Sequence, residues 1–286
     1  MEFDVAFQAR GLSAMRRACS AVLEIYAKKD HSVEYKEGNE PVTAADLACN
    51  RILEKELSAM LPQAGWLSEE SGKDLEALSK KELLWVVDPI DGTREFMARN
   101  DQFAISVGLV KQGLPVWGMI ALPAEDLIAI TEDTGVKQYP VHSESMDPDS
   151  EAIHRVNAST DLALAQARIC VSQTEWRKGI FRDQASELNI VAEGSVARKL
   201  ALVSIGRYDL TVSLYPKNDW DIAGGLALIL SSGGVFANPE NDDSVVLHPP
   251  GKTRPGLVCG SAALVSQYQQ YFRKKGLRMR ASYGSD

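Results

Sequence analysis

The apolar run Leu-Leu-Trp-Val-Val at 83–87 ends abruptly in a hexapeptide, Asp-Pro-Ile-Asp-Gly-Thr at 88–93. A short apolar run that is closed by a proline is typical of a buried β-strand, so the hexapeptide is predicted to lie at a strand end. An Asp-Pro pair alone is most simply a solvated turn. The complete hexapeptide is more informative, because it places the carboxylates of Asp88 and Asp91 three positions apart on a turn that a proline and a glycine help to fix.

These two carboxylates and the carbonyl oxygen of Ile90 form a cluster of hard oxygen ligands. Mg²⁺ prefers oxygen ligands of this kind, at about 2.1 Å. The hexapeptide therefore predicts a magnesium site at the end of a strand.

The residues before this strand predict two helices, and those after it predict a meander. Apolar residues recur at helical spacing over 5–28, and Thr43 can N-cap a second helix over 44–60. Two apolar runs, 103–110 and 116–122, are separated by a turn sequence, which is the pattern of antiparallel strands. The first half of the chain is expected to combine helices with a sheet.

After a polar segment at 141–160 the pattern changes to alternating strands and helices, which indicates an α/β second half. We therefore divide the chain near residue 150, into halves spanning 1–150 and 151–286. In the second half we expect strands at 167–172, 188–192, 208–214, 234–237 and 256–259, and helices at 175–187, 195–206, 219–232 and 261–275.

Charge limits the kinds of ligand. Lysine and arginine total 31 and aspartate and glutamate 39, a net charge of 31 − 39 = −8, and no long basic run is present. Polymeric nucleic acid is therefore not an expected partner. If the substrate is an anion, an acidic protein must reverse the field locally, and bound divalent cations do so.

The four cysteines, Cys19, Cys49, Cys170 and Cys259, form no CxxC pair, so we expect reduced and mostly buried thiols rather than a zinc site or disulfides. The first residues lack the apolar core of a signal peptide, and no segment approaches the ~20 apolar residues of a membrane span. We expect a cytoplasmic protein with no membrane partner.

Two further acidic clusters occur, at 68–71 and at 218–221, the second leading into the glycine pair 224–225. Each cluster alone is more commonly surface charge or a helix N-cap. Together with Asp88 and Asp91 they would complete a cage for more than one metal ion. Two ions roughly 4 Å apart can activate a water and stabilise both oxygens of an in-line displacement.

Asp46 has two interpretations. It can be simply an acid in the first turn of the helix over 44–60. Alternatively, it can bind a further cation or orient the attacking water through the hydroxyl of Thr93.

The order of these motifs resembles the inositol monophosphatase superfamily, a group of lithium-sensitive, magnesium-dependent phosphatases. The resemblance rests on four segments: Pro-Val-Thr-Ala-Ala-Asp at 41–46, Glu-Glu-Ser at 69–71, Trp-Val-Val-Asp-Pro-Ile-Asp-Gly-Thr at 85–93 and Trp-Asp-Ile-Ala-Gly-Gly at 220–225. It implies a layered αβαβα sandwich of the inositol monophosphatase and fructose-1,6-bisphosphatase type, an α/β (α+β) fold with the active site between the halves. It also allows a homodimer.

The resemblance further implies a role for each matching residue. Two to three Mg²⁺ would be held by Glu69, Asp88, the Ile90 carbonyl, Asp91 and Asp221. Asp46 and Thr93 match residues associated with the attacking water, and Glu69 is expected to share in catalysis. The amides of Gly92 and Thr93 would hold the phosphate. Most metal ligands then come from the N-terminal half, and Asp221 with the specificity residues from the C-terminal half.

Substrate choice depends on less specific positions. Ser195 and Lys199 lie in Gly-Ser-Val-Ala-Arg-Lys-Leu at 194–200, and a lysine that faces the cleft would suit a second phosphate on the substrate. With Lys217 and with Thr-Arg-Glu-Phe at 93–96, this resembles the 3'(2'),5'-bisphosphate nucleotidase branch. The expected reaction is removal of the 3'-phosphate of adenosine 3',5'-bisphosphate, a small anionic substrate.

Other interpretations of the lysines and of the function stay open. Lysines are mostly exposed, so Lys199 and Lys217 can also be solvated charges. Asp219 can stand in for the acid that inositol-specific members use on sugar hydroxyls, which would make the protein an inositol-1-phosphate phosphatase. A non-catalytic phosphate-ligand sensor on the same scaffold would be expected to lack a metal carboxylate, and none is missing here.

Overall fold

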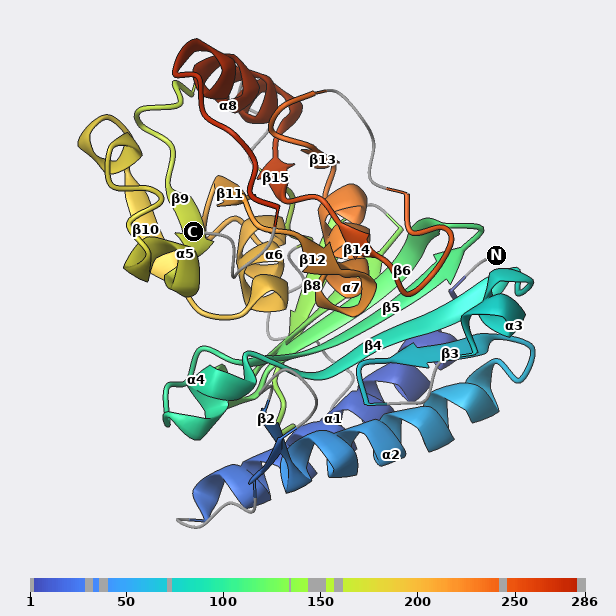
Figure 1. Cartoon of the computed structure of the whole chain (residues 1–286). Helices are drawn as coiled ribbons and strands as arrows, with labels where there is room; N and C mark the ends of the chain where they lie inside the picture. The colour runs from blue at the N-terminus through green and yellow to red at the C-terminus, as the bar shows by residue number, and fades with distance from the viewer. Residues whose placement is uncertain are drawn as a thin grey trace.

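The structure is a computed structural model, and it describes residues 3–28, 33–35, 41–70, 74–133, 135–143, 153–156, 162–241 and 246–281. Five layers follow one another, helices alternating with sheets (Figure 1). The αβαβα sandwich expected from the resemblance is therefore confirmed.

The first layer is a pair of helices, α1 (Val5–Ala27) and α2 (Ala44–Met60), which pack side by side under the first sheet (Figure 1). Thr43 caps α2 as expected: its hydroxyl accepts from the amide of Ala45, and the Asp46 carboxylate accepts from the Thr43 amide in return. The apolar faces of both helices join one face of the sheet in a single core.

The second layer is a six-stranded sheet in the order β3-β4-β5-β6-β7-β8. Only the β3–β4 pair is parallel. The strands are β3 (Gly65–Ser68), β4 (Leu83–Asp91), β5 (Ala104–Lys111), β6 (Leu114–Leu122), β7 (Leu127–Glu132) and β8 (Gly135–Tyr139).

One expectation about β4 was wrong. The strand does not stop at Asp88-Pro89 but continues to Asp91, with a register shift against β5 between Asp88 and Asp91. The shift occurs because Pro89 has no amide to donate to the neighbouring strand. The irregular end of β4 turns the carboxylates away from a regular ladder.

The middle layer consists of α6 (Val196–Ser204) and α7 (Asp219–Ser231), which lie between the two sheets (Figure 1). Glycines allow α7 to touch the first sheet backbone to backbone. A Cβ at Gly224 would lie 2.7 Å from the carbonyl oxygen of Val107, and one at Gly118 would lie 2.3 Å from the carbonyl oxygen of Gly224. This close approach fixes the start of α7, where Asp221 lies, against β5 and β6.

The fourth and fifth layers are the second sheet and the helix α8 (Ala262–Lys274), which covers its outer face. The sheet has the order β10-β9-β11-β15-β13. Its strands are β9 (Ile169–Ser172), β10 (Ile190–Glu193), β11 (Leu210–Ser213), β13 (Val235–Ala237) and β15 (Leu257–Gly260).

Short elements connect these layers. They are β1 (Val33–Tyr35), β2 (Pro41–Thr43), α3 (Leu75–Ser79), α4 (Thr93–Met97), η1 (Pro123–Glu125), α5 (Gln173–Arg177), η2 (Gln184–Ser186), β12 (Lys217–Asn218) and β14 (Thr253–Arg254). The helix expected over 175–187 is wrong in extent, because α5 ends at Arg177 and Gly179 follows with a positive φ of 77°. Only the single turn η2 remains of its second part.

Three expectations concern the ends and joints of the chain. The division near residue 150 lies outside the described residues and stays a prediction. All four cysteines are described, and they are buried and unpaired as expected. Among the helices that the structure describes, none is both long and apolar enough to cross a membrane.

Candidate active site

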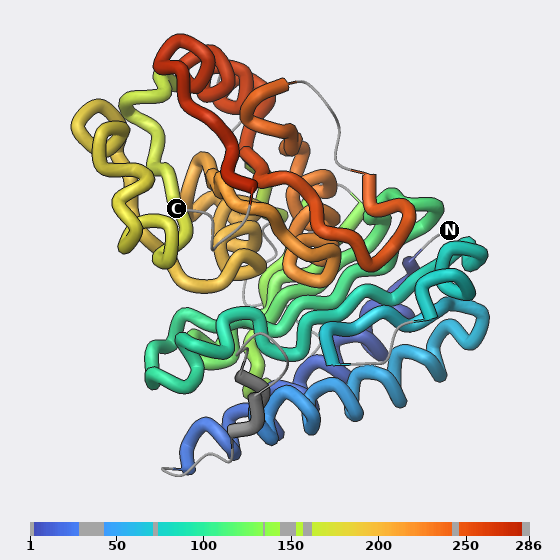
Figure 2. The backbone as a smooth tube through the Cα atoms, in the orientation of Figure 1, coloured from blue at the N-terminus to red at the C-terminus, as the bar shows by residue number. Residues whose placement is uncertain are grey.

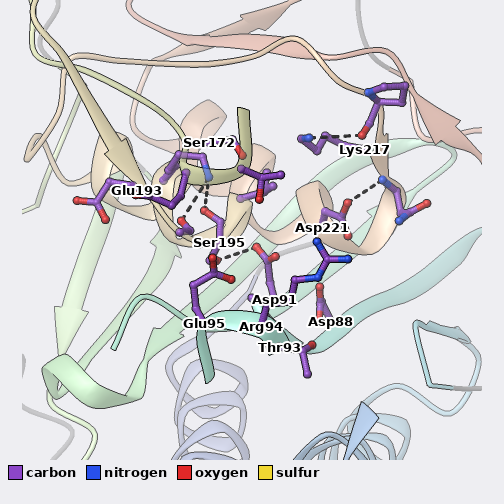
Figure 3. A pocket seen from close by; sticks show the side chains of 18 of the residues that line it. Asp88, Asp91, Thr93, Arg94, Glu95, Ser172, Glu193, Ser195, Lys217 and Asp221 are labelled. Atoms are coloured by element: carbon purple, nitrogen blue, oxygen red, sulfur yellow. Dashed lines mark hydrogen bonds between the residues drawn. The ribbon is translucent and has the colours of Figure 1, made fainter. Parts of the chain in front are cut away.

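A cavity of about 1070 Å³ opens between the first sheet and the C-terminal half. Acidic side chains reach it from β4, from the end of β3 and from the start of α7, and Figure 3 shows Asp88, Asp91 and Asp221 in the same part of the pocket, with Asp91 directed to Ser195. The cavity brings together most residues that the sequence singled out: Glu69, Asp88, Ile90, Asp91, Gly92, Thr93, Ser195, Lys199, Lys217 and Asp221.

Three of these acids have no basic partner. Within the described residues, Asp88, Asp91 and Asp221 form no ion pair with a lysine, arginine or histidine side chain. Burial raises the pKa of Asp88 well above its usual value, and the charges of Glu69, Asp91 and Asp221 raise it further. Burial and the charge of Asp91 likewise raise the pKa of Asp221 to about 8. The ionised carboxylates therefore repel one another, and a bound cation would relieve this repulsion.

Asp91 is held by the start of α6. Its Oδ2 accepts from the Ser195 hydroxyl at 2.7 Å and from the Ala197 amide at 2.5 Å. Ser195 has a φ of 45°, which is rare for a residue with a side chain, and its hydroxyl oxygen also accepts from the Arg198 amide. Ser195, expected to bind substrate, thus contacts a predicted metal ligand in this structure.

The loop after β4 depends on Gly92. This residue has a φ of 94°, in the left-handed region that favours glycine, and a Cβ there would meet the Gln102 carbonyl at 3.3 Å. The hydroxyl of Thr93 donates to the carbonyl oxygen of Ile90 at 3.1 Å. Both residues line the cavity beside Asp91.

Asp221 is fixed by the helix that carries it. Its Oδ2 accepts from the amide of Asn218 at 2.8 Å, closing a capping box at the start of α7. Glu69 follows β3, and its amide donates to the Val87 carbonyl on β4. The β3–β4 pairing therefore brings Glu69 to the same end of the sheet as Asp88.

Asp46 is the one predicted catalytic residue that does not line this cavity. It is 1% exposed, and its Oδ2 accepts from the Thr43 amide and hydroxyl. Burial raises its pKa to about 6 against the effect of these hydrogen bonds, and its charge contributes to the raised pKa of Asp88. Asp46 is therefore close enough to affect Asp88, although it does not line the cavity.

Both lysines that the sequence singled out are buried, so the reading of them as solvated charges is wrong. Lys199 is 2% exposed and its Nζ donates to the carbonyls of Gly194 and Ser195. Burial lowers its pKa, against the charge of Asp91. Lys217 is also 2% exposed, and its Nζ lies 3.5 Å from Oε1 of Glu175. Both lysines nevertheless line the cavity.

Asp219 does not take the position expected of a sugar-binding acid. It is 1% exposed and accepts from Nε of Arg254 at 2.6 Å and from the amide of Gly251 at 2.7 Å. It is not among the cavity-lining residues of the described chain. Its carboxylate instead anchors the segment before β14 to the start of α7.

Several cavity residues were missed by the sequence reasoning. Cations lie along the wall that the C-terminal half provides: Lys178 after α5, Arg254 on β14 and Arg280 after α8. Glu175, which is buried next to Lys217 and is not among the described cavity-lining residues, was missed as well. No local pattern marks these residues, because each reaches the site from a different element.

The donor set suits a hard divalent cation, since three buried or half-buried carboxylates without a basic partner face one cavity. No group of three or more His, Cys, Asp or Glu side chains in the described chain is already placed as a complete metal site. The carboxylates would therefore turn toward an ion on binding, Asp91 away from Ser195.

The layered fold and this acid-lined cavity define a class of protein, the phosphoric monoester hydrolases built on an αβαβα sandwich. The chain belongs to the inositol monophosphatase family, whose model matches residues 4–271. Members of this family are metal-dependent phosphatases that act on small phosphate substrates.

Curated relatives and solved structures agree with this membership. The chain is 32% identical over 218 residues to the 3'(2'),5'-bisphosphate nucleotidase CysQ of Haemophilus influenzae, covering 74% of this chain and 77% of the relative. It is 29% identical to CysQ of Escherichia coli over 76% of this chain and 85% of the relative. The solved extragenic suppressor protein suhB of Bartonella henselae shares the fold, with a TM-score of 0.75 and 24% identity over 94% of this chain and 99% of that one.

Proposed function

We propose that the protein is a Mg²⁺-dependent nucleotidase that removes the 3'-phosphate of adenosine 3',5'-bisphosphate. The observation that carries this proposal is the division of charge within one cavity. The carboxylates of Glu69, Asp88, Asp91 and Asp221 gather in one part of the cavity, and most of its lysines and arginines come from the C-terminal half, while Arg94 on α4 and Glu193 on β10 also line it. A substrate with two phosphates matches this division, because one phosphate can meet the metal side while the other meets the cations.

The volume of the cavity and the similarity to curated relatives support the same substrate class. A cavity of about 1070 Å³ is at the upper end of the roughly 300–1,000 Å³ range of small-molecule sites, which leaves room for a nucleotide. The curated relatives named above are called 3'(2'),5'-bisphosphate nucleotidases.

Each residue then has a task in the reaction. Glu69, Asp88, Asp91, Asp221 and the Ile90 carbonyl would hold two to three Mg²⁺. Such ions supply an activated water and stabilise the charge that develops on the phosphate. Gly92 and Thr93 line the cavity, and their amides would hold the reacting phosphate, because amide donors favour developing negative charge. Thr93, Glu69 and Asp46 would orient the attacking water.

The alternative substrate, inositol 1-phosphate, loses its main support in this geometry. That reading depended on Asp219 contacting sugar hydroxyls, and both carboxylate oxygens of Asp219 accept hydrogen bonds from Arg254 or Gly251. A cytoplasmic location and a homodimer, expected earlier, remain predictions.

A phosphate-release panel tests the proposal. We would compare adenosine 3',5'-bisphosphate, inositol 1-phosphate and fructose 1,6-bisphosphate at fixed Mg²⁺ and ionic strength, with a chelator as the metal-free control. We expect the highest kcat/KM on adenosine bisphosphate and no release after chelation. A higher kcat/KM on inositol 1-phosphate would overturn the assignment of the substrate, and release that survives chelation would overturn the assignment of Mg²⁺.

A further inference from the structure

The chain continues beyond α8, and this C-terminal tail, residues 275–281 as described, returns to the candidate active site. In Figure 2 it is the red segment that descends from α8 across the second sheet. Arg280 and Ala281 line the cavity. The family model matches residues 4–271, so this part of the cavity wall lies outside the matched residues.

The tail is held in place by specific contacts along its length. The amide of Leu277 donates to the Phe272 carbonyl at 3.1 Å, and the amide of Met279 donates to Oε1 of Glu240 at 2.8 Å. The amide of Arg280 donates to the carbonyl of Leu214, at the end of β11, at 2.9 Å.

Side-chain packing supports these bonds. Leu277 and Met279 pack against the core between the second sheet and α8. A Cβ at Gly256 would lie 2.4 Å from Cε of Met279, so the Met279 side chain packs closely over that glycine. Arg280 is therefore presented by a fixed backbone.

Arg280 differs from the buried lysines of the same wall. Lys199 and Lys217 are almost fully buried. Arg280 is exposed at the cavity, where a ligand can reach it. A guanidinium also offers a planar fork of donors that matches two oxygens of a phosphate, which an ammonium group does not.

We propose that Arg280 determines specificity by binding the phosphate of the substrate that is not hydrolysed. The inference rests on the proposed bisphosphate substrate, and it adds a residue and an element, the C-terminal tail, to that site. Because this contact lies away from the reacting phosphate, it acts equally on the ground state and the transition state and changes KM rather than kcat.

The test compares two substrates that differ only in the second phosphate, adenosine 3',5'-bisphosphate and adenosine 3'-monophosphate. We expect Arg280→Ala to raise KM for the bisphosphate roughly tenfold, the size of a charge-assisted contact at a partly exposed group, with kcat unchanged. KM for the monophosphate should stay the same. Arg280→Lys should restore part of the loss, because it keeps the charge but not the fork.

Arg278→Ala is the matched control, since Arg278 is an exposed arginine of the same tail that is not among the cavity-lining residues described. It should leave KM for both substrates unchanged. A wild-type enzyme that prefers the bisphosphate, with Arg280→Ala behaving like Arg278→Ala, would overturn the role of Arg280 and leave the proposed function standing. A wild-type enzyme that turns over inositol 1-phosphate but neither nucleotide would overturn both.

Discussion

Asp91 joins the two halves of the molecule through a single carboxylate. The residue comes from the end of β4, and its Oδ2 accepts from Ser195 and Ala197 at the start of α6. The side chain that is expected to bind metal therefore also fixes the N-terminus of a helix from the second half.

We predict that Asp91→Asn abolishes turnover and leaves the fold intact. The amide oxygen of asparagine can still accept from Ser195, but it lacks the charge needed to bind Mg²⁺. Loss of metal stabilisation of the transition state should lower kcat at least ~10³-fold. Phosphate release measures the rate, and circular dichroism checks the fold.

Asp133→Asn is the control for this variant, because Asp133 is an exposed acid outside the cavity. Its activity should equal that of the wild type. An Asp91→Asn enzyme with more than a tenth of wild-type activity would show that Asp91 is not a metal ligand.

At the scale of elements, the contact between α7 and the first sheet positions Asp221. A Cβ at Gly224 would lie 2.7 Å from the Val107 carbonyl oxygen and 2.8 Å from Oγ of Ser106, both on β5. The Val107 carbonyl belongs to the backbone of the sheet, so it cannot move aside as the end of a flexible side chain can. The helix would therefore have to move away.

We predict that Gly224→Ala destabilises the protein by about 1–3 kcal/mol, the range for overpacking a core. Because α7 would shift with Asp221, kcat should fall as well. Urea unfolding and phosphate release measure the two effects. Leu230→Gln, at an exposed position of the same helix, should change stability by no more than ~0.5 kcal/mol; equal stability of the two variants would contradict this account of the packing.

A second contact between elements is the buried pair of Glu175 on α5 and Lys217 on β12. Glu175 is fully buried, and besides Lys217 it accepts from the Ser213 hydroxyl and from the amide of Leu214. These bonds tie α5 to the end of β11 and place Lys217 at the cavity.

We predict that Glu175→Gln costs about 3–5 kcal/mol of stability, because it removes the carboxylate charge opposite the buried ammonium of Lys217. The double variant Glu175→Gln/Lys217→Met should be less destabilised than the sum of the two single variants. Urea unfolding of all four proteins gives the coupling. Strict additivity would mean that the two side chains do not stabilise each other.

At the scale of the whole molecule, the acid cluster links stability to pH and to Mg²⁺. The pKa of Asp221 is about 8 in the folded protein, above its usual value of 3.8, and that of Asp88 is also raised. Between the unfolded and the folded pKa of Asp221, the metal-free folded protein binds more protons than the unfolded chain. The free energy of unfolding therefore falls as the pH rises from about 4 to 8. Mg²⁺ requires ionised carboxylates, so its stabilising effect should grow over the same window.

We predict that Mg²⁺, at a concentration about 100 times its Kd at pH 8, stabilises the protein by about 2.7 kcal/mol at that pH, a rise in Tm of roughly 5–10 °C. The same Mg²⁺ concentration should stabilise it much less at pH 5.5. Differential scanning fluorimetry with sodium chloride at matched ionic strength measures the shift. Asp221→Asn should reduce it. An equal shift at both pH values would argue that Mg²⁺ binds away from these carboxylates.

Local signals in the sequence were sufficient for much of this protein. The cap at Thr43 predicted the start of α2, and the apolar run at 83–87 predicted a buried strand, although that strand continues through Asp88 to Asp91. These features depend on interactions between residues that are close in the sequence, so they can be predicted from the sequence alone. The helix expected over 175–187 failed because the conformation at Gly179 ends α5, and periodicity alone did not weigh that residue.

The assignment of partners was decided only by the tertiary structure. Asp219 pairs with Arg254, Lys217 with Glu175, and Asp91 with Ser195, each across 35 or more positions of the chain. Arg280 reaches the cavity because the tail returns to Leu214, directly after β11, where the Arg280 amide donates to the Leu214 carbonyl. The sequence thus determined which groups can carry metal and phosphate chemistry. Only the folded chain decided which of them face the cavity and which are neutralised elsewhere, because a charge buried by distant segments takes whatever partner the packing brings within reach.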